Sequence, residues 1–300
     1  SPTHHSVMQL ARTFADARAG YRGRVALVPT MGFFHEGHLA LMRAAKATAD
    51  TLIVSVFVNP LQFDDPSDLD RYPRDLDRDL AMAEAERVDI VFAPPLADMY
   101  PDSPRTRVTV ADVAASLEGP HRPGHFEGVA TVVAKLFAGL QPRSAHFGRK
   151  DAQQLAVVRT LAADLSFPVT VIGHPTVREA DGLALSSRNV LLEQQDRPGA
   201  LLLSKGLFAA AELAESGERS ATRLEQVVGS IIQPLEVDYV ELAAQNTAEL
   251  LDQLDRPSFL AAAVRVGSVR LIDNVAFDLI GGEVMADRGV RLQQPSMLYS

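Results

Sequence analysis

The turn at 29–38 constrains this chain more than any other segment; its sequence is Pro-Thr-Met-Gly-Phe-Phe-His-Glu-Gly-His. The apolar run at 25–28 predicts a buried strand before the turn, and residues 39–46 predict a helix after it. Where a helix begins after a strand, free backbone N–H groups and the helix dipole favour an anion. The segment therefore indicates an α/β fold with a phosphate or nucleotide site at this turn.

Two histidines give this turn its chemistry. His35 and His38 lie three residues apart, which places both rings on one side of the first helical turn. Gly37 leaves the backbone between them open to a ligand. The alternative is an ordinary strand–turn–helix corner whose histidines make local hydrogen bonds. A zinc site fits poorly, because helical metal pairs are usually spaced i, i+4 with a further ligand.

Composition narrows the class of protein. The chain has 300 residues and is 47 % hydrophobic, enough for one large domain or two ordinary ones. A net charge of −9 without a basic block argues against a nucleic-acid partner. No apolar stretch reaches the roughly 18 residues that a membrane span needs. Residues 1–5 lack the pattern of a signal peptide, and His4 and His5 receive no function.

Cysteine is absent from the chain. Disulfides and thiolate zinc sites are therefore excluded. A protein without cysteine fits a reducing compartment, so we predict a cytoplasmic location.

Strands and helices are expected to alternate through the first half of the chain. A first helix is expected through Val7, Leu10, Ala11 and Phe14, with Ser6 as its N-cap. Alternation predicts a doubly wound, parallel, Rossmann-like sheet, whose ligands sit beyond the carboxyl ends of the strands at a topological switch point. The expected strands are 24–28, 51–58, 89–93, 144–147 and 168–172, and the expected helices are 38–48, a segment through Leu76, Leu80 and Ala83, 126–140 and 151–164.

The pattern changes after about residue 176. Helices are expected at 198–214 and 219–233, followed by short, closely spaced strands at 237–242, 259–266 and 269–273. We predict two domains. Residues 1–176 would form a Rossmann-like nucleotide- and substrate-binding domain. Residues 177–300 would form a smaller α+β domain that closes over it, with the loop 174–189 at the hinge.

Two further turns that follow expected strands carry polar groups. The amide of Gln62 both donates and accepts, which suits a hydroxyl or carboxylate of a small substrate. Lys150 can neutralise a polyphosphate as a point charge. Asp151 can cap a helix or hold a ribose hydroxyl, and Gln154 shares its face. The alternatives are a polar turn anchored by Phe63 and a capped helix with a solvated lysine.

The loop 181–189 offers the paired hydroxyls of Ser186 and Ser187 beside Arg188. These groups are natural donors to a triphosphate, and such a loop can close over it; the alternative is a solvated hinge. The acidic stretch 64–70 and the nearby Asp79 can help hold Mg²⁺, although acidic surface explains most of these residues. No P-loop, GxGxxG or GxSxG pattern occurs.

Several motifs occur in a specific order: the histidine turn at 29–38, VNPLQF at 58–63, Tyr-Pro-Arg at 72–74, RPGHFEGVATVV at 122–133, and segments at 147–154, 175–189, 238–242 and 270–274. Together they closely resemble the pantothenate synthetase (pantoate–β-alanine ligase) family of the HIGH-motif nucleotidyltransferases. The resemblance covers nearly the whole chain.

The resemblance implies a two-step reaction. ATP and pantoate give pantoyl adenylate and pyrophosphate, and the amine of β-alanine then attacks the activated carbonyl, giving pantothenate and AMP. It further implies Mg²⁺, with Asp79 as its candidate ligand, and a homodimer. His38 would be the proton donor.

The resemblance also assigns site residues. The implied catalytic groups are His35, His38, Lys150, Ser186, Ser187 and Arg188. The implied ATP site comprises Met31, Gly32, His35, Gly37, His38, Gly148, Arg149, Lys150, Asp151, Val177, Leu185, Ser186, Ser187 and Arg188. Pantoate would be held by Gln62 and Gln154, and the substrate-binding set also includes Met31, Asn59, Tyr72 and Arg122.

Some positions depart from the family pattern. Phe33 and Phe34 are bulkier than the usual residues, Arg149 and Arg78 stand where acidic residues are common, and Leu185 replaces a methionine. The substitutions at Phe33, Phe34, Arg78 and Arg149 keep one alternative open, a nucleotide-binding protein that has lost turnover. A second alternative, from the same superfamily, is a nucleotidyltransferase that adenylylates another small acid.

Overall fold

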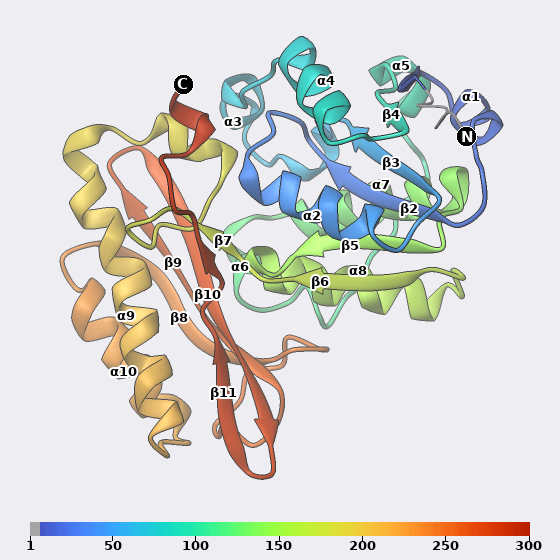
Figure 1. Ribbon diagram of the computed structural model, residues 1–300. Helices are drawn as coiled ribbons and strands as arrows, with labels where there is room; N and C mark the ends of the chain where they lie inside the picture. The colour runs from blue at the N-terminus through green and yellow to red at the C-terminus, as the bar shows by residue number, and fades with distance from the viewer. Residues whose placement is uncertain (1–6) are drawn as a thin grey trace.

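The computed structural model describes residues 7–300, and its two larger sheets lie in separate lobes of the molecule (Figure 1). The six strands of the first sheet run parallel in the order β1-β4-β3-β2-β5-β6. The predicted doubly wound parallel sheet is therefore confirmed. Its strands are β1 (Gln9–Ala11), β2 (Val25–Thr30), β3 (Thr51–Val56), β4 (Ile90–Phe92), β5 (Ser144–Gly148) and β6 (Thr170–His174).

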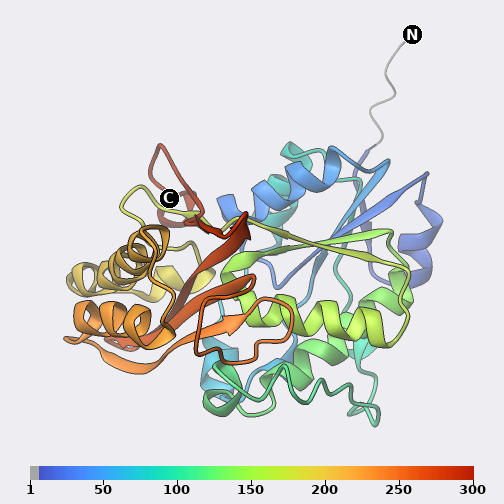
Figure 2. The same cartoon turned by 90° about the horizontal axis from the view of Figure 1, so that it is seen from below.

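Helices cover both faces of the parallel sheet (Figure 2). α1 (Phe14–Ala19), α7 (His125–Leu140) and α8 (Ala152–Asp164) share one core cluster, and α2 (Glu36–Lys46) and α4 (Leu76–Ala85) share another on the opposite face. The shorter helices are α3 (Pro66–Arg71), α5 (Leu96–Met99) and α6 (Glu118–His121).

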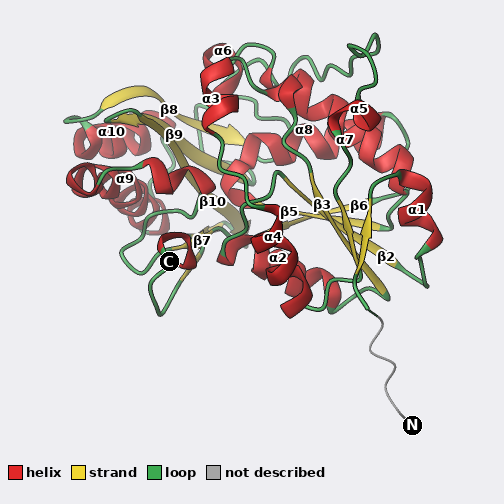
Figure 3. Ribbon diagram, turned by 90° about the horizontal axis from the view of Figure 1, so that it is seen from above, coloured by secondary structure: helices red, strands yellow, loops and turns green. Residues whose placement is uncertain are grey.

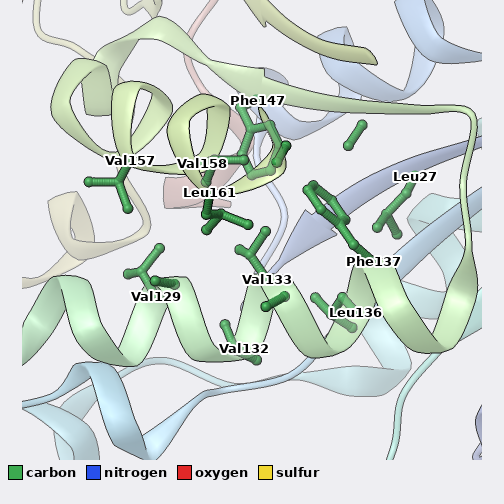
Figure 4. Close-up of a cluster of buried hydrophobic side chains, with 14 of the residues drawn as sticks. Leu27, Val129, Val132, Val133, Leu136, Phe137, Phe147, Val157, Val158 and Leu161 are labelled. Carbon is green, nitrogen blue, oxygen red and sulfur yellow. The ribbon is translucent and has the colours of Figure 1, made fainter. Parts of the chain in front are cut away.

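The core between the sheet, α7 and α8 is made of close-packed aliphatic and aromatic side chains (Figure 4). Val129, Val133 and Phe137 project from α7 toward Leu161 of α8 and Phe147 of β5. These side chains recur at four-residue spacing along α7, so that one helix face is apolar. Val129 and Val133 of this face also line a cavity at the carboxyl ends of β2 and β3.

The order of the strands places a switch point between β2 and β5. From β2 the chain proceeds to β3 on one side, and it later returns to place β5 and β6 on the other side. The connections after β2 and β5 therefore leave the sheet in opposite directions and open a crevice at the carboxyl ends of these strands. The histidine turn follows β2, and the Gly148–Asp151 turn follows β5.

The expected first helix through Val7 and Phe14 is wrong. Residues 9–11 instead form β1, which pairs in parallel with β4, and the helix begins only at Phe14, where the Thr13 side chain accepts the N–H of Asp16. A three-residue edge strand is too short to show a strand pattern of its own, so the helical spacing of the apolar residues dominates the prediction. The strand that it pairs with lies about 80 residues away along the chain, where a local pattern cannot reveal it. The predicted cap Ser6 lies outside the described residues.

The second lobe is an antiparallel sheet backed by two helices (Figure 3). Its strands have the order β11-β10-β9-β8, and α9 and α10 pack on one face. The bounds are α9 (Arg197–Glu215), α10 (Ala221–Ile232), β8 (Glu236–Ala244), β9 (Ser258–Val266), β10 (Val269–Ile280) and β11 (Glu283–Asp287). Strand β11 was not among the strands expected from the sequence.

The other face of this antiparallel sheet packs against the parallel-sheet lobe. Along β9, Leu260 and Val264 belong to the core under α9 and α10, whereas Phe259 and Ala261 belong to the core of α7 and α8. This two-residue alternation is the usual pattern of a strand buried on both faces. The lobes therefore share a packed apolar contact in addition to the polar groups described below.

A short two-stranded element connects the lobes. β7 (Val177–Arg178) follows β6 directly and pairs in parallel with β12 (Val290–Arg291). The fully buried guanidinium of Arg178 donates to both carboxylate oxygens of Asp273 at 2.6 and 2.9 Å, which anchors β7 on β10. The domain division at residue 176 falls between β6 and β7 and stays a prediction.

Among residues 7–300, no helix is both long enough and apolar enough to cross a membrane.

Gly128 allows α7 to lie against the turn that carries Gln62. A Cβ at this position would lie 2.5 Å from the backbone nitrogen of Gln62 and against the carbonyl of Leu61. We expect Gly128→Ala to lower the free energy of unfolding by roughly 1–3 kcal/mol, because backbone atoms cannot rotate out of the way. Urea denaturation measures the change.

Gly229→Ala in α10 is the matched control. No atom lies within 4 Å of the added Cβ, so alanine should raise stability by about 0.5–1 kcal/mol through its helix propensity. Equal effects of the two substitutions would contradict the proposed close approach of α7 to the Gln62 turn.

Candidate active site

A cavity of about 190 Å³ lies beside the carboxyl ends of β2 and β3, against α7. One wall is apolar and the other carries amide, hydroxyl, imidazole and carboxylate groups. The structure thus brings together Met31, His38, Asn59, Gln62, Tyr72, Asp151 and Gln154, which the sequence analysis placed in one site. The lining residues are Pro29, Thr30, Met31, His38, Ser55, Phe57, Asn59, Gln62, Tyr72, Val129, Val132, Val133, Leu136, Phe147, Asp151 and Gln154.

The Gln62 amide is oriented by buried neighbours. Asn59 Nδ2 donates to Gln62 Oε1 at 3.0 Å and to the carbonyl of Gly128 at 3.0 Å, while Asn59 Oδ1 accepts the hydroxyl of Tyr100 at 3.0 Å. With its oxygen engaged, Gln62 presents Nε2 as the donor that remains for a ligand. Asn59 lines the cavity as predicted, and it also holds Gln62 in position.

Both histidines of the turn are held in one tautomer. His35 caps α2 by accepting the N–H of Gly37 on Nδ1 at 3.0 Å, and His38 accepts the N–H of His35 on Nδ1 at 3.1 Å. In the neutral form an imidazole that accepts at Nδ1 carries its proton on Nε2. The hydrogen bonds therefore assign Nε2–H to both rings as their free donor.

Burial keeps these imidazoles neutral. Desolvation lowers the pKa of His38 to about 4, and the Arg78 guanidinium contributes to this lowering. Desolvation also lowers the pKa of His35 well below its usual value, followed by the effects of His38 and Lys150. At neutral pH both rings are hydrogen-bond donors without a positive charge.

Asp79 holds the histidine turn in shape. Its carboxylate, which is 2 % exposed, accepts the N–H of Phe33 and the N–H of Phe34, each at 2.8 Å. Phe33 has a φ of 53°, a left-handed conformation that few non-glycine residues adopt. Burial raises the pKa of Asp79, and the two N–H groups oppose this rise.

Asp79 therefore does not fit the predicted magnesium role, because both of its oxygens are engaged by the backbone. Within residues 7–300, no group of three or more His, Asp or Glu side chains could hold a metal ion. Near the site, Asp68 pairs with Arg188 at 2.9 Å and Asp65 caps α3.

The bulky residues of the turn are accommodated by Arg78 and by the core beneath α2. Arg78 lies over the Phe33 ring at 4.7 Å and donates to the carbonyl of Phe34 at 2.9 Å. Phe34 is fully buried in the core beneath α2. Phe34 is therefore a core residue, and the Phe33 ring is stabilised by its contact with the Arg78 guanidinium.

A second cavity, of about 300 Å³, lies between the lobes. It is lined by Arg122, Lys150, Asp151, Ser186 and Arg188 from the predicted site, together with β10 residues of the small lobe. Asp151 lines both this cavity and the 190 Å³ cavity. The two cavities are therefore adjacent at the start of α8.

The Ser186–Arg188 loop contacts the histidine turn from the small lobe. Ser187 Oγ donates to the carbonyl of Phe33 at 3.0 Å, and Ser186 Oγ accepts the N–H of Arg188 at 3.2 Å. The Arg188 guanidinium lies over the ring of Tyr72 at 5.3 Å. Ser187 thus fastens the loop, while Ser186 and Arg188 line the cavity.

The turn after β5 is tied to the small lobe through its backbone. Asn274 Nδ2 donates to the carbonyls of Arg149 and Lys150 at 2.9 and 2.8 Å, and Arg149 pairs with Asp287 at 2.9 Å. The Arg149 side chain, predicted to bind ATP, is therefore engaged by β11. Asp151 makes no capping bond, which leaves its carboxylate available at the junction of the cavities.

Leu185, Gly32 and Gly148, also predicted to bind ATP, are not among the residues that line the two cavities. Leu185 donates its N–H to the carbonyl of Val177 at 2.9 Å, which shapes the loop before Ser186. Gly32 has a φ of 82°, and a Cβ there would approach Asp79 Oδ2 at 2.9 Å. Gly148 has open space where a Cβ would stand, so the backbone after β5 is accessible to a ligand.

The sequence analysis missed a partly buried ionic cluster at the edge of the inter-lobe cavity. Arg270 donates to both oxygens of Glu118 at 2.7 and 2.8 Å and to Asp238 at 2.7 Å, and Tyr239 donates to Glu118 at 2.8 Å. These residues are up to 152 positions apart, so no local pattern could pair them. The cluster joins α6 of one lobe to β8 and β10 of the other.

The C-terminal segment was also missed. Ser296 Oγ and the N–H of Met297 donate to the carboxylate of Glu36 at 2.8 and 2.6 Å, at the first turn of α2. The chain end thereby reaches the histidine turn (Figure 1).

Taken together, the switch-point crevice, the paired imidazole donors and the adjoining amide-lined pocket define an ATP-dependent α/β enzyme that acts on a small acid. A family model described as pantoate-beta-alanine ligase matches residues 3–276. The chain belongs to this family, and it catalyses the ATP-dependent condensation of pantoate with β-alanine through a pantoyl adenylate, releasing AMP and pyrophosphate.

Named relatives support this assignment. The pantothenate synthetase of Roseiflexus castenholzii is 51 % identical over 264 residues, which cover 87 % of this chain and 95 % of the relative. The crystal structure of pantothenate synthetase from Thermus thermophilus is 45 % identical, with a TM-score of 0.85 over 89 % of this chain and 98 % of that one. The ligase from Francisella tularensis, complexed with beta-gamma ATP and beta-alanine, is 33 % identical, with a TM-score of 0.73 over 89 % of this chain and 97 % of that one.

Buried neutral histidines make stability depend on pH. The folded-state pKa of His38 is lowered to about 4, whereas an unfolded histidine titrates near about 6.5, so the unfolded chain binds more protons between these values. We expect the free energy of unfolding to fall as pH drops from about 6.5 to about 4, by up to about 1.4 kcal/mol per pH unit for this residue.

Urea titrations over this pH range measure that slope. In His38→Asn, the asparagine Oδ1 can still accept the N–H of His35. This variant should lose the part of the slope that comes from the uptake of about one proton on unfolding. An unchanged slope would show that His38 is not buried in the neutral form.

Proposed function

We propose that pantoate occupies the 190 Å³ cavity, called the acid pocket from here on, and that ATP extends from the histidine turn across the inter-lobe cavity. The observation that carries this proposal is the position of Asp151, which lines both cavities, with His38 in the wall of the first. A carboxylate in the first cavity and a phosphate chain in the second would meet at this junction.

The lining of the acid pocket suits pantoate. Val129, Val133 and Leu136 offer branched apolar surface to the two methyl groups of the acid. Gln62 Nε2 and the amide of Gln154 offer neutral donors to its carboxylate and hydroxyls. Neutral donors orient a carboxylate without lowering its nucleophilicity as strongly as a salt bridge would.

The first step needs in-line attack of the pantoate carboxylate on the α-phosphorus of ATP. Two anions must approach, so their repulsion has to be offset and the charge on the leaving pyrophosphate has to be stabilised. Lys150 and Arg188 supply positive charge, and Ser186 and the Nε2–H groups of His35 and His38 supply directed donors. No covalent intermediate on the protein is required.

In this arrangement His38 acts in its neutral form. Its Nε2–H donates a hydrogen bond to a phosphate oxygen, and this bond strengthens as negative charge develops in the transition state. Burial lowers the pKa of His38 to about 4, so the ring is neutral at neutral pH before ATP binds. The proposal therefore gives His38 the role of a hydrogen-bond donor, and the proton-donor role that the resemblance implies stays a prediction.

The second step needs a neutral amine and a shielded adenylate. Arg122, which lines the inter-lobe cavity, is assigned to the carboxylate of β-alanine. The amine would then attack the carbonyl carbon of the adenylate and release AMP. The lobe formed by 177–300 closes this site, which keeps water from hydrolysing the adenylate.

Three further assignments belong to the same proposal. Mg²⁺ accompanies ATP and is coordinated largely by phosphate and water. The enzyme acts in the cytoplasm and forms a homodimer, as the family resemblance implies. Nucleic acid and membrane are not among its proposed partners, in keeping with the net charge of −9.

Exchange of labelled pyrophosphate into ATP tests the proposal, because adenylate formation is reversible. With Mg²⁺ and without β-alanine, exchange should require pantoate. Exchange supported by other small acids but not by pantoate would favour a different nucleotidyltransferase. ATP binding without any exchange would indicate a protein that has lost turnover.

His38→Ala should lower the rate of pantoate-dependent exchange by about 10²-fold or more, because it removes a preorganised transition-state donor. His174→Ala is the matched control, since His174 is also partly buried but lines neither the acid pocket nor the inter-lobe cavity. An undiminished rate in the His38 variant would remove this residue from the chemistry.

Gln62→Ala should mainly raise the KM for pantoate, by roughly 10-fold or more, because it removes a hydrogen-bond donor from the acid pocket. Initial rates of exchange at varied pantoate and varied ATP separate the two effects. A change confined to the KM for ATP would contradict the assignment of this cavity to pantoate.

A further inference from the structure

Ser55 places a buried hydroxyl without a partner in the wall of the acid pocket. The side chain belongs to β3 and is 1 % exposed, and its Oγ has no hydrogen-bond partner. The same residue lines the acid pocket together with Gln62 and Gln154.

The neighbours of Ser55 within the sheet are apolar. Ile53 and Phe57 lie on the same face of the chain two residues before and after it, and both belong to the core beneath α7. Across the sheet, Ser55 is paired with Pro29 of β2 and Phe92 of β4. A hydroxyl in this environment loses its hydrogen bonds to water and gains none from the protein.

Buried polar side-chain atoms without a hydrogen-bond partner are uncommon in folded proteins. Among residues 7–300, the only other buried side-chain polar atoms without a partner are Asn189 Oδ1 and Ser258 Oγ. Neither of these residues lines the acid pocket. Within the described chain, Ser55 is therefore the one such group whose missing partner can be supplied by a ligand in that pocket.

We propose that the Ser55 hydroxyl pairs with one of the two hydroxyls of the bound acid and so selects a hydroxylated substrate. This inference rests on the proposed assignment of the acid pocket to pantoate. A ligand hydroxyl at Ser55 gains a hydrogen bond in a site already shielded from water, whereas an analogue without that hydroxyl leaves the serine unpaired.

The test compares substrates in the acid-dependent exchange assay. The substrates are pantoate and its two analogues that each lack one hydroxyl, on the carbon next to the carboxylate or at the far end of the acid. The wild type should prefer pantoate over both analogues. In Ser55→Ala, the preference over one of the analogues should fall by about tenfold or more, because kcat/KM falls for pantoate and is nearly unchanged for that analogue.

Ser258→Ala is the matched control. It removes the other buried, unpartnered serine hydroxyl of the described residues, on β9 of the small lobe, and should leave both preferences unchanged. If Ser55→Ala lowers kcat/KM by one common factor for all three acids, or changes neither preference, the proposed pairing is wrong.

A second variant guards against a folding defect. Ser55→Cys nearly preserves the side-chain volume, and its thiol is a weak hydrogen-bond donor, so it should show the same loss of preference in a folded protein. If the wild type exchanges with pantoate and neither variant changes the preferences, only the Ser55 inference fails. If the wild type shows no pantoate-dependent exchange, the proposed function fails first.

Discussion

The site depends on one buried carboxylate. Asp79 on α4 receives the backbone N–H groups of Phe33 and Phe34 and thereby holds the turn after β2 in a conformation that includes a left-handed phenylalanine. Because the turn is held in this way, α2 begins with His35 as its cap, and His38 bonds back to the His35 backbone. The Nδ1 atom of each imidazole accepts one of these hydrogen bonds, so the Nε2–H of each ring remains as a donor for a ligand. The chemistry of the site thus follows from the backbone geometry of one turn.

The small lobe completes the site through bonds to backbone atoms of the large lobe. Ser187 donates to the carbonyl of Phe33, and Asn274 donates to the carbonyls of Arg149 and Lys150. These bonds join the small lobe to the turns after β2 and β5, which are the two turns of the switch point. Displacement of the small lobe would break these bonds and move Ser186 and Arg188 away from the turns after β2 and β5. Under the proposed function, these bonds would couple the position of the small lobe to assembly of the ATP site.

The sequence predicted the parallel sheet and the residues that gather in the crevice, because both follow from local patterns. Apolar runs indicated the central strands, and the rule that ligands bind at the carboxyl ends of such strands predicted the convergence of Met31, Gln62, Asp151 and Gln154. Prediction failed where distant residues decide the outcome. The edge strand β1 exists because β4 pairs with it, and the carboxylate of Asp79 is engaged by a turn more than 40 positions earlier in the chain.

The most direct test of this account is a crystal structure with pantoate and a non-hydrolysable ATP analogue bound together. The account predicts a carboxylate oxygen of pantoate about 3–3.5 Å from the α-phosphorus and in line with the leaving oxygen, beside Asp151. It also predicts His38 Nε2 within hydrogen-bond distance of a phosphate oxygen and the acid against Gln62. Pantoate outside the 190 Å³ cavity, or phosphates remote from the histidine turn, would contradict the account.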